Sequence, residues 1–143
     1  LEPATFTLGQ HHQAARELVA EVRRIWDQDL PHEDWVVRFL QAVGSDPDTL
    51  SPELIAAAVP LVPVFRLGRP IWEAEPPLAE LKSATFAKLV VSGGHSVGFD
   101  VICDELAERI GASRMVIAGA GHEIQFTGRP LNQALLRTWG GQP

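Results

Sequence analysis

The feature that most constrains this 143-residue chain is a pair of short apolar runs near its end, each followed by a glycine-rich turn. Residues 88–92 (Lys-Leu-Val-Val-Ser) and 115–117 (Met-Val-Ile) are rich in β-branched residues, which favours buried strands. Between them, apolar residues recur at helical spacing from Phe99 to Ile110, and Gly111 is a typical helix end. A strand, a helix and a second strand in this order predict a βαβ unit of a parallel sheet with a right-handed crossover.

The turns that follow the two predicted strands hold the most concentrated polar chemistry of the chain. Residues 93–98 read Gly-Gly-His-Ser-Val-Gly and contain His95 and Ser96. Residues 119–122 read Gly-Ala-Gly-His and end on His122. Functional groups of parallel sheets gather where strands end and loops begin. These three side chains are therefore the first candidates for a functional site.

A last helix is predicted after Pro130 and extends to Trp139. The order of strand, Gly-Gly-His turn, helix, strand, Gly-Ala-Gly-His turn and closing helix resembles the C-terminal end of an α/β-hydrolase. The resemblance covers residues 88–139 and implies an α/β fold in which the chain supplies the last two core strands of a parallel sheet. In that family the turn after the last core strand carries the catalytic histidine, which corresponds to His122 here.

The first part of the chain is predicted to be helical. Apolar residues recur at helical spacing in residues 11–30 and 34–43. Ser51 followed by Pro52 is a typical start for a third helix. No strand is predicted in this part, so the chain divides into an all-helical segment and an α/β segment.

Prolines are frequent after the third predicted helix. We expect Pro60 and Pro63 to disturb the helical pattern there. Residues 65–77 contain three more prolines and are expected to cross the surface as a loop. A short helical turn at residues 78–82 then leads into the first strand.

The resemblance assigns a role to each of these segments. Residues 1–84 would form the helical lid, or cap, of the hydrolase, and residues 85–143 would form the C-terminal strands and helices of its core. A lid usually supplies apolar walls to the substrate pocket. For each candidate taken singly, a place in the core is the stronger interpretation, because most apolar residues at helical spacing are core residues. The candidates are Trp26, Trp35, Phe39, Phe65 and Trp72.

His122 is the best candidate for a catalytic residue. A hydrolytic base takes a proton from a nucleophile and returns it to the leaving group, which requires a side chain that titrates near neutral pH. Gly119 and Gly121 allow the tight turn that would hold this side chain at the edge of the sheet. The alternative is a histidine that only caps a helix or bonds to the backbone.

Ser96 allows a different interpretation. Residues 94–98 match Gly-x-Ser-x-Gly, the nucleophile elbow, and lie between a strand and a helix. An elbow turns directly off its strand, however, and here Ser92 and Gly93 intervene. The acids between Ser96 and His122 all fall in or at the start of the next helix, where none is well placed to orient the histidine: Asp100, Asp104, Glu105 and Glu108.

The carboxylate partner of His122 is then expected elsewhere. In the family, the loop after the penultimate core strand often carries the acid in a Gly-x-x-Asp pattern, but residues 93–96 read Gly-Gly-His-Ser. Some α/β-hydrolases, the haloalkane dehalogenases among them, place the acid after the preceding core strand. The resemblance assigns that position to Glu2 if Leu1 ends such a strand. The alternative is an exposed terminal carboxylate.

Composition limits the classes of protein and of site. Hydrophobic residues make up 45% of the chain and charged residues 21%, which is typical of a globular domain. The net charge of −6 argues against a nucleic-acid-binding or membrane-binding surface. The single cysteine, Cys103, is expected in the core, needs no oxidising compartment, and is consistent with a cytoplasmic location. No spacing of residues indicates a metal site, and no glycine motif indicates a nucleotide cofactor.

Two strands alone form only a small part of a typical parallel sheet and leave both of its edges unpaired. Because residues 1–3 (Leu-Glu-Pro) resemble the end of another strand, we expect the chain to be the C-terminal portion of a longer α/β-hydrolase, inactive alone. Its nucleophile and oxyanion hole would lie in the N-terminal half. The expected partners are that half or a second copy of the chain, and a small apolar substrate in the full-length enzyme.

Two alternatives remain open at this point. The first is a non-catalytic module that binds a partner or associates with itself through its incomplete sheet. The second is a self-contained serine hydrolase that uses Ser96. The sequence does not distinguish an esterase from a dehalogenase or another hydrolase subtype.

Overall fold

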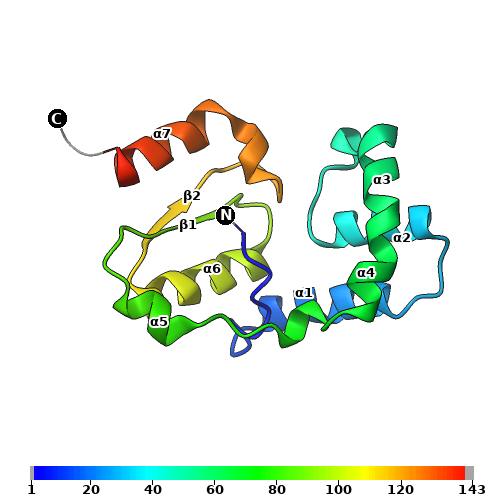
Figure 1. The fold of residues 1–143 in the computed structure, drawn as a ribbon, viewed down its shortest axis with the longest axis horizontal. Helices are drawn as coiled ribbons and strands as arrows, with labels where there is room; N and C mark the ends of the chain where they lie inside the picture. The colour runs from blue at the N-terminus through cyan, green and yellow to red at the C-terminus, as the bar shows by residue number, and fades with distance from the viewer. Residues whose placement is uncertain (1, 141–143) are drawn as a thin grey trace.

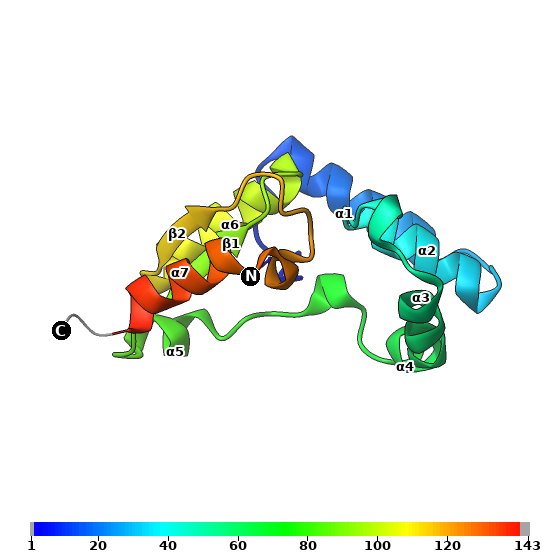
Figure 2. The ribbon, with the colours of Figure 1, turned by 90° about the horizontal axis from the view of Figure 1, so that it is seen from above.

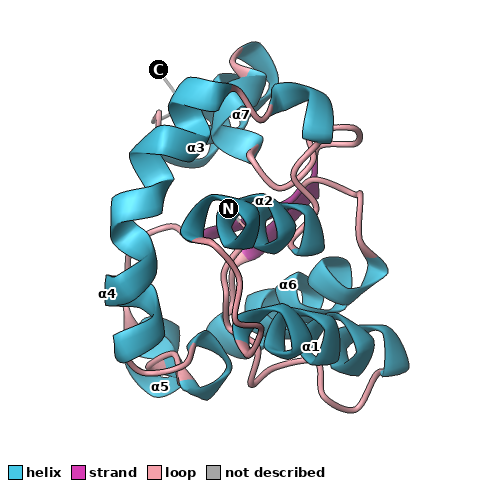
Figure 3. Ribbon diagram, turned by 90° about the vertical axis from the view of Figure 1, so that its right-hand side faces the viewer, coloured by secondary structure: helices cyan, strands magenta, loops and turns pink. Residues whose placement is uncertain are grey.

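The computed structural model describes residues 2–140, a mixed α/β structure that is mostly helical (Figures 1 and 3). Its sheet has two parallel strands, β1 (Leu89–Ser92) and β2 (Ser113–Val116). Leu1, which was expected to end a further strand, lies outside the described residues.

The predicted βαβ unit is confirmed. Helix α6 (Val97–Ile110) joins the two strands, and Leu89 pairs with Ser113 at the start of the register. Strand β2 begins two residues earlier than the apolar run that predicted it. Ile117 lies just beyond the strand, yet its N–H donates to the carbonyl oxygen of Ser92 at 2.9 Å. The carboxyl ends of both strands therefore meet at one edge.

The sheet lies between two helices (Figure 1). Val90 packs on the side of α6, in a cluster with Phe99 and Ile102. Val91, the next residue of β1, packs on the opposite side with Ile124 and with α7 (Arg129–Trp139). Successive side chains of a strand point to opposite faces, so one strand supplies both layers of the core.

The helical part of the chain extends away from the sheet and returns to it (Figure 2). Its helices are α1 (Gln13–Trp26), α2 (His32–Ala42), α3 (Pro52–Ala58), α4 (Val62–Leu67) and α5 (Leu78–Ser83). Short 3₁₀ turns lie at Pro47–Thr49, Val59–Leu61, Ile71–Glu73 and Ile124–Thr127. The predicted start of α3 is confirmed, because the Ser51 hydroxyl accepts the N–H of Leu54 at 3.2 Å.

The expectation for the proline-rich stretch is wrong in part. Residues 65–67 belong to α4, and a 3₁₀ turn interrupts the predicted loop at Ile71–Glu73. Pro60 and Pro63 do not break the helical path, because each lies in the first turn of its element. A first-turn residue has no intrahelical N–H bond to lose.

Helix α1 packs against α6 and joins the two parts of the chain. Val22 from α1 and Ile102 from α6 are fully buried in one cluster. Gly98 permits the close approach, since a Cβ atom there would lie 2.8 Å from the carbonyl oxygen of Ala14. Residues 1–84 and 85–143 thus share a hydrophobic core.

The aromatic residues of the helical part pack mainly on one another. Trp26 contacts Trp35, Phe39 and Trp72, with ring centroids 5.5, 6.0 and 5.3 Å away. Trp26 and Trp35 are both buried. Phe65 differs, since its side chain is exposed. The packing of Trp26, Trp35, Phe39 and Trp72 agrees with the interpretation that these side chains belong to the core.

Candidate functional site

The structure places Glu2 and His122 side by side, although 120 positions separate them in the sequence. Oε2 of Glu2 lies 3.0 Å from Nδ1 of His122. The Glu2 side chain is only 1% exposed, whereas that of His122 is 27% exposed. The alternative that Glu2 is an exposed terminal carboxylate is therefore wrong. The two residues proposed as partners on the basis of the family resemblance form a buried acid–histidine pair.

The second oxygen of the Glu2 carboxylate is also engaged. The backbone N–H of Gly93 donates to Oε1 at 2.7 Å, and Nδ1 of His95 lies 3.4 Å from the same atom. A carboxylate that is removed from water is costly unless hydrogen bonds replace its hydration. The N–H of Gly93, in the loop after β1, supplies such a bond and thereby fixes the carboxylate at the carboxyl end of the strand.

Close backbone contact brings the two glycine-rich turns together. A Cβ atom on Gly93 would lie 1.9 Å from the carbonyl oxygen of Gly121, a distance that no side chain tolerates. Gly121 itself has a positive φ of 64°, which glycine adopts at little cost. The glycines therefore allow His122 to approach the loop that holds Glu2.

The apolar ring of Phe99 packs against the rings of both histidines. Its ring centroid lies 5.2 Å from that of His122 and 5.7 Å from that of His95. The Phe99 ring is fully buried and also packs on Phe6, 5.9 Å away. Such apolar surroundings lower the local dielectric and strengthen the interactions of the carboxylate.

The two ring nitrogens of His122 have different surroundings. Nδ1 faces a carboxylate oxygen, which can only accept a hydrogen bond, so Nδ1 carries the proton of the neutral ring. Nε2 has no hydrogen-bond partner among residues 2–140. A neutral His122 thus presents a free Nε2 lone pair, which is the group that a general base requires.

Ser96 has a structural contact. It is the N-cap residue of α6, and its hydroxyl accepts the N–H of Phe99 at 3.4 Å. Within the described chain, the Ser96 hydroxyl forms no hydrogen bond with a histidine. This geometry is that of a helix cap.

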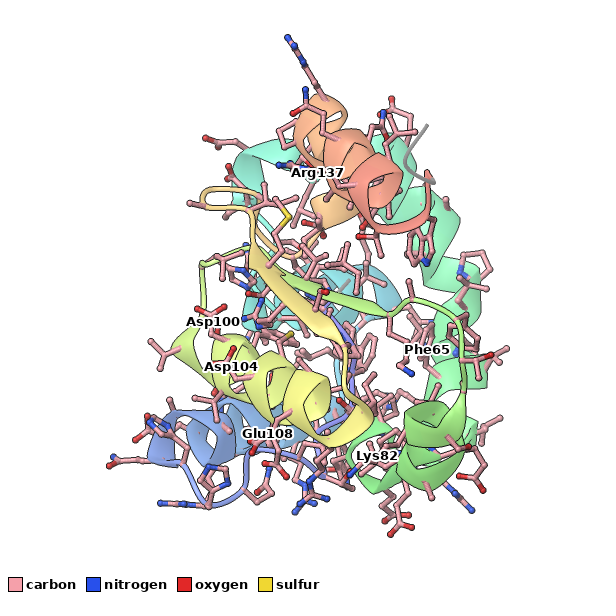
Figure 4. The ribbon with its side chains drawn as sticks, turned by 90° about the vertical axis from the view of Figure 1, so that its left-hand side faces the viewer. Phe65, Lys82, Asp100, Asp104, Glu108 and Arg137 are labelled. Carbon is pink, nitrogen blue, oxygen red and sulfur yellow. The ribbon has the colours of Figure 1, made fainter. Side chains whose placement is uncertain are left out.

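Three of the four acids of α6 have partners away from His122. Asp100 bonds to the hydroxyl of Ser92 and lies 3.4 Å from Arg114, and Asp104 lies 2.7 Å from the same guanidinium. Glu105 accepts the N–H of Gly9 at 2.6 Å. Figure 4 shows Asp100, Asp104 and Glu108 in succession along α6.

Cys103 is buried on α6, as its place in the helical pattern predicts. Burial raises the pKa of the Cys103 thiol to about 12, so the thiol stays protonated at neutral pH. Because the thiolate is the reactive form, Cys103 is not available as a nucleophile.

A cavity of about 220 Å³ lies against the turn that carries His122. Its lining residues come from this turn, from the loop after α2 and from the 3₁₀ turn after the site: Asp46, Gly119, Ala120, Gly121, Glu123, Phe126 and Thr127. Phe126 is largely exposed, so the cavity opens at the surface.

The loop after α2 contacts the site, a feature that the sequence did not predict. Nε2 of His95 lies 3.1 Å from the carbonyl oxygen of Val43, and the buried Ser45 hydroxyl donates to the carboxylate of Glu123. Neither the Val43–Ser45 segment nor its spacing from His95 carries a motif. Only the folded chain brings these residues together.

Comparisons with protein-family models, curated proteins and solved structures found no match to this chain. Across residues 2–140, no helix is long and apolar enough to cross a membrane. In the same part of the chain, no three His, Cys, Asp or Glu side chains converge in a way that would hold a metal ion.

Proposed function

We propose that this chain supplies the general base of an α/β-hydrolase and the carboxylate that orients it. His122 is the base and Glu2 is its partner. The observation that carries the proposal is the 3.0 Å contact between Oε2 of Glu2 and Nδ1 of His122, with the Glu2 side chain 1% exposed. The nucleophile would come from outside residues 1–143, because no hydroxyl or thiol of the described chain bonds to His122.

In this mechanism Nε2 of His122 accepts the proton of the nucleophile, or of an attacking water, and later returns it to the leaving group. Glu2 holds the imidazole in the tautomer with the proton on Nδ1 and stabilises the positive charge that develops on the ring. The contact of Gly93 with Oε1 keeps the other end of the carboxylate fixed. Backbone N–H groups of the N-terminal hydrolase half that this proposal requires would stabilise the developing oxyanion.

The helical part supports the interpretation as a lid. Helices α2 to α4 lie apart from the sheet and reach the site through the loop that follows α2 (Figure 2). This loop and the His122 turn border the cavity of about 220 Å³. A small substrate that reacts at His122 would occupy the region between them. The class of ester or related substrate stays open.

His122→Ala in the full-length enzyme tests the proposal. We expect kcat/KM for ester hydrolysis to fall by roughly a thousandfold or more, because the proton acceptor is lost. The melting temperature should also fall, because the variant removes one of the groups that replace the hydration of the buried Glu2 carboxylate, so kcat/KM is compared at a temperature at which the variant is folded. His32→Ala is the matched control, because His32 is exposed at the start of α2. Retained activity in His122→Ala would remove this residue from the mechanism.

A second candidate function is association with a partner or with another copy of the chain. Large apolar side chains lie exposed on the short helix α4 and on α7. Leu67 is 88% exposed and Leu136 is 67% exposed. Contiguous exposed apolar surface is typical of an interaction site. This function does not require His122, so the His122→Ala measurement separates the two candidates.

A further inference from the structure

The two oxygens of the Glu2 carboxylate have different partners. Oε2 faces His122, and Oε1 faces Gly93 and His95. A carboxylate that is held at one oxygen only can rotate about its last bond. The orientation of Oε2 toward His122 therefore depends on what holds Oε1.

The ring of His95 connects Oε1 to the loop after α2. A carbonyl oxygen only accepts hydrogen bonds, so the contact of 3.1 Å to Val43 places a proton on Nε2 of His95. Nδ1 then points at Glu2 from 3.4 Å and donates to it when the ring carries its second proton, which makes the contact an ion pair. The same ring thus reaches the carboxylate with one nitrogen and the loop after α2 with the other.

The loop after α2 packs closely against the ring of His95. Gly44 has a positive φ of 92°, and a Cβ atom at this position would lie 2.1 Å from Nε2 of His95. The next residue, Ser45, is buried and bonds to Glu123, the neighbour of His122. Residues 43–45 therefore contact the neighbourhood of both histidines.

We propose that His95 is a positioning residue that transmits the docking of residues 43–45 to the Glu2 carboxylate. When the loop is docked and the His95 ring carries both protons, Nδ1 of His95 donates to Oε1, and Oε2 stays directed at Nδ1 of His122. The loop after α2 would in this way set the geometry of the catalytic base without a hydrogen bond to the base itself. The catalytic meaning of this role rests on the proposed function, whereas the geometric claim can be measured without a substrate.

The test uses the ring ¹⁵N signals of His122 in the 143-residue chain, which report the nitrogen that carries the proton. Two variants disturb His95 in different ways. His95→Gln retains an amide that reaches Val43 but lacks the nitrogen that faces Glu2. Gly44→Ala leaves the His95 side chain intact and displaces it through the added methyl group. Gly111→Ala is the matched control, because Gly111 also has a positive φ, 64°, but has no neighbouring atom within 4 Å.

We expect the wild-type chain and Gly111→Ala to hold His122 mainly as the tautomer with the proton on Nδ1. His95→Gln and Gly44→Ala should shift His122 toward a mixture of both tautomers while the urea-unfolding transition stays cooperative. An unchanged His122 signal in both variants would overturn the positioning role. A change in His95→Gln alone would contradict the part assigned to the loop. Loss of hydrolysis plays no role in this readout, so failure of the proposed function is seen separately, in the kinetics of His122→Ala.

Discussion

At the scale of single residues, the buried position of Glu2 is the most informative finding. A carboxylate side chain is ordinarily exposed, and burial removes its hydration. Here Gly93, His95 and His122 replace that hydration. The burial of Glu2 costs hydration energy, and it places the carboxylate next to a partly exposed imidazole. We regard this arrangement as more typical of a functional site than of a structural ion pair.

We predict that Ser96 stabilises the N-terminus of α6 and takes no part in the reaction. Ser96→Ala removes the N-cap bond to Phe99 and should destabilise the chain by about 1 kcal/mol, as other N-cap replacements do. Hydrolysis by the full-length enzyme should stay within a few-fold of wild type. Urea unfolding and steady-state kinetics measure the two effects. Covalent labelling of Ser96 by a phosphonate probe would instead support the self-contained serine hydrolase.

At the scale of elements, the site depends on the contact between the two glycine-rich turns. The turn after β1 and the turn after β2 meet where Gly93 faces the backbone of Gly121. Parallel strands bring their carboxyl ends to one edge, and small residues then let the two turns approach. The distance between Glu2 and His122 is set by this contact.

Gly93→Ala tests the contact between the turns. The added methyl group would lie 1.9 Å from the carbonyl oxygen of Gly121, so the backbone must move. We expect a loss of more than about 2 kcal/mol in the free energy of unfolding, as for a strongly overpacked site. Gly119→Ala is the control, because Gly119 has a positive φ of 77° but open space around its Cβ position. A larger loss in Gly119→Ala than in Gly93→Ala would contradict the importance of the contact.

The sequence predicted the elements whose signal is local. The apolar runs and helical spacing were sufficient for β1, α6 and α7, and the dipeptide Ser51-Pro52 marked the start of α3. Helix α4 was missed because Pro63 has a different effect in a first helical turn than inside a helix. The distinction depends on where the preceding turn ends, which the sequence pattern does not fix.

The site was predictable to a smaller extent. The family resemblance gave Glu2 and His122 as partners, and the structure brings these residues together. His95 was noted only as a polar residue in a turn. His95 contacts Val43, 52 positions earlier in the sequence, and Glu2, 93 positions earlier. No sequence periodicity connects positions so far apart.

At the scale of the whole molecule, the sheet is small for a parallel sheet. Strands β1 and β2 form a pair without further neighbours among residues 2–140. Val116 on β2 is 49% exposed, and Trp139 at the end of α7 is 55% exposed. Natural proteins usually cover such edges and apolar side chains.

We therefore expect the 143-residue chain to associate, either with a second copy or with the N-terminal half. Each Å² of apolar surface left in water costs about 25 cal/mol relative to burial, so a few hundred Å² is a large fraction of a marginal stability. Sedimentation velocity at low micromolar concentration measures the state of the chain. A monomer that melts cooperatively would show that the two strands are sufficiently covered within one chain.

The double-mutant cycle of Glu2→Gln and His122→Ala in the full-length enzyme tests most directly whether the two residues act as one catalytic unit. Glu2→Gln should lower kcat/KM by at least about a hundredfold, because an amide no longer fixes the tautomer of His122 or stabilises its charge. Residues that act through one another give non-additive effects. We predict that the double variant is no slower than His122→Ala alone. A double variant slowed by the product of the two single effects would contradict a common role for Glu2 and His122.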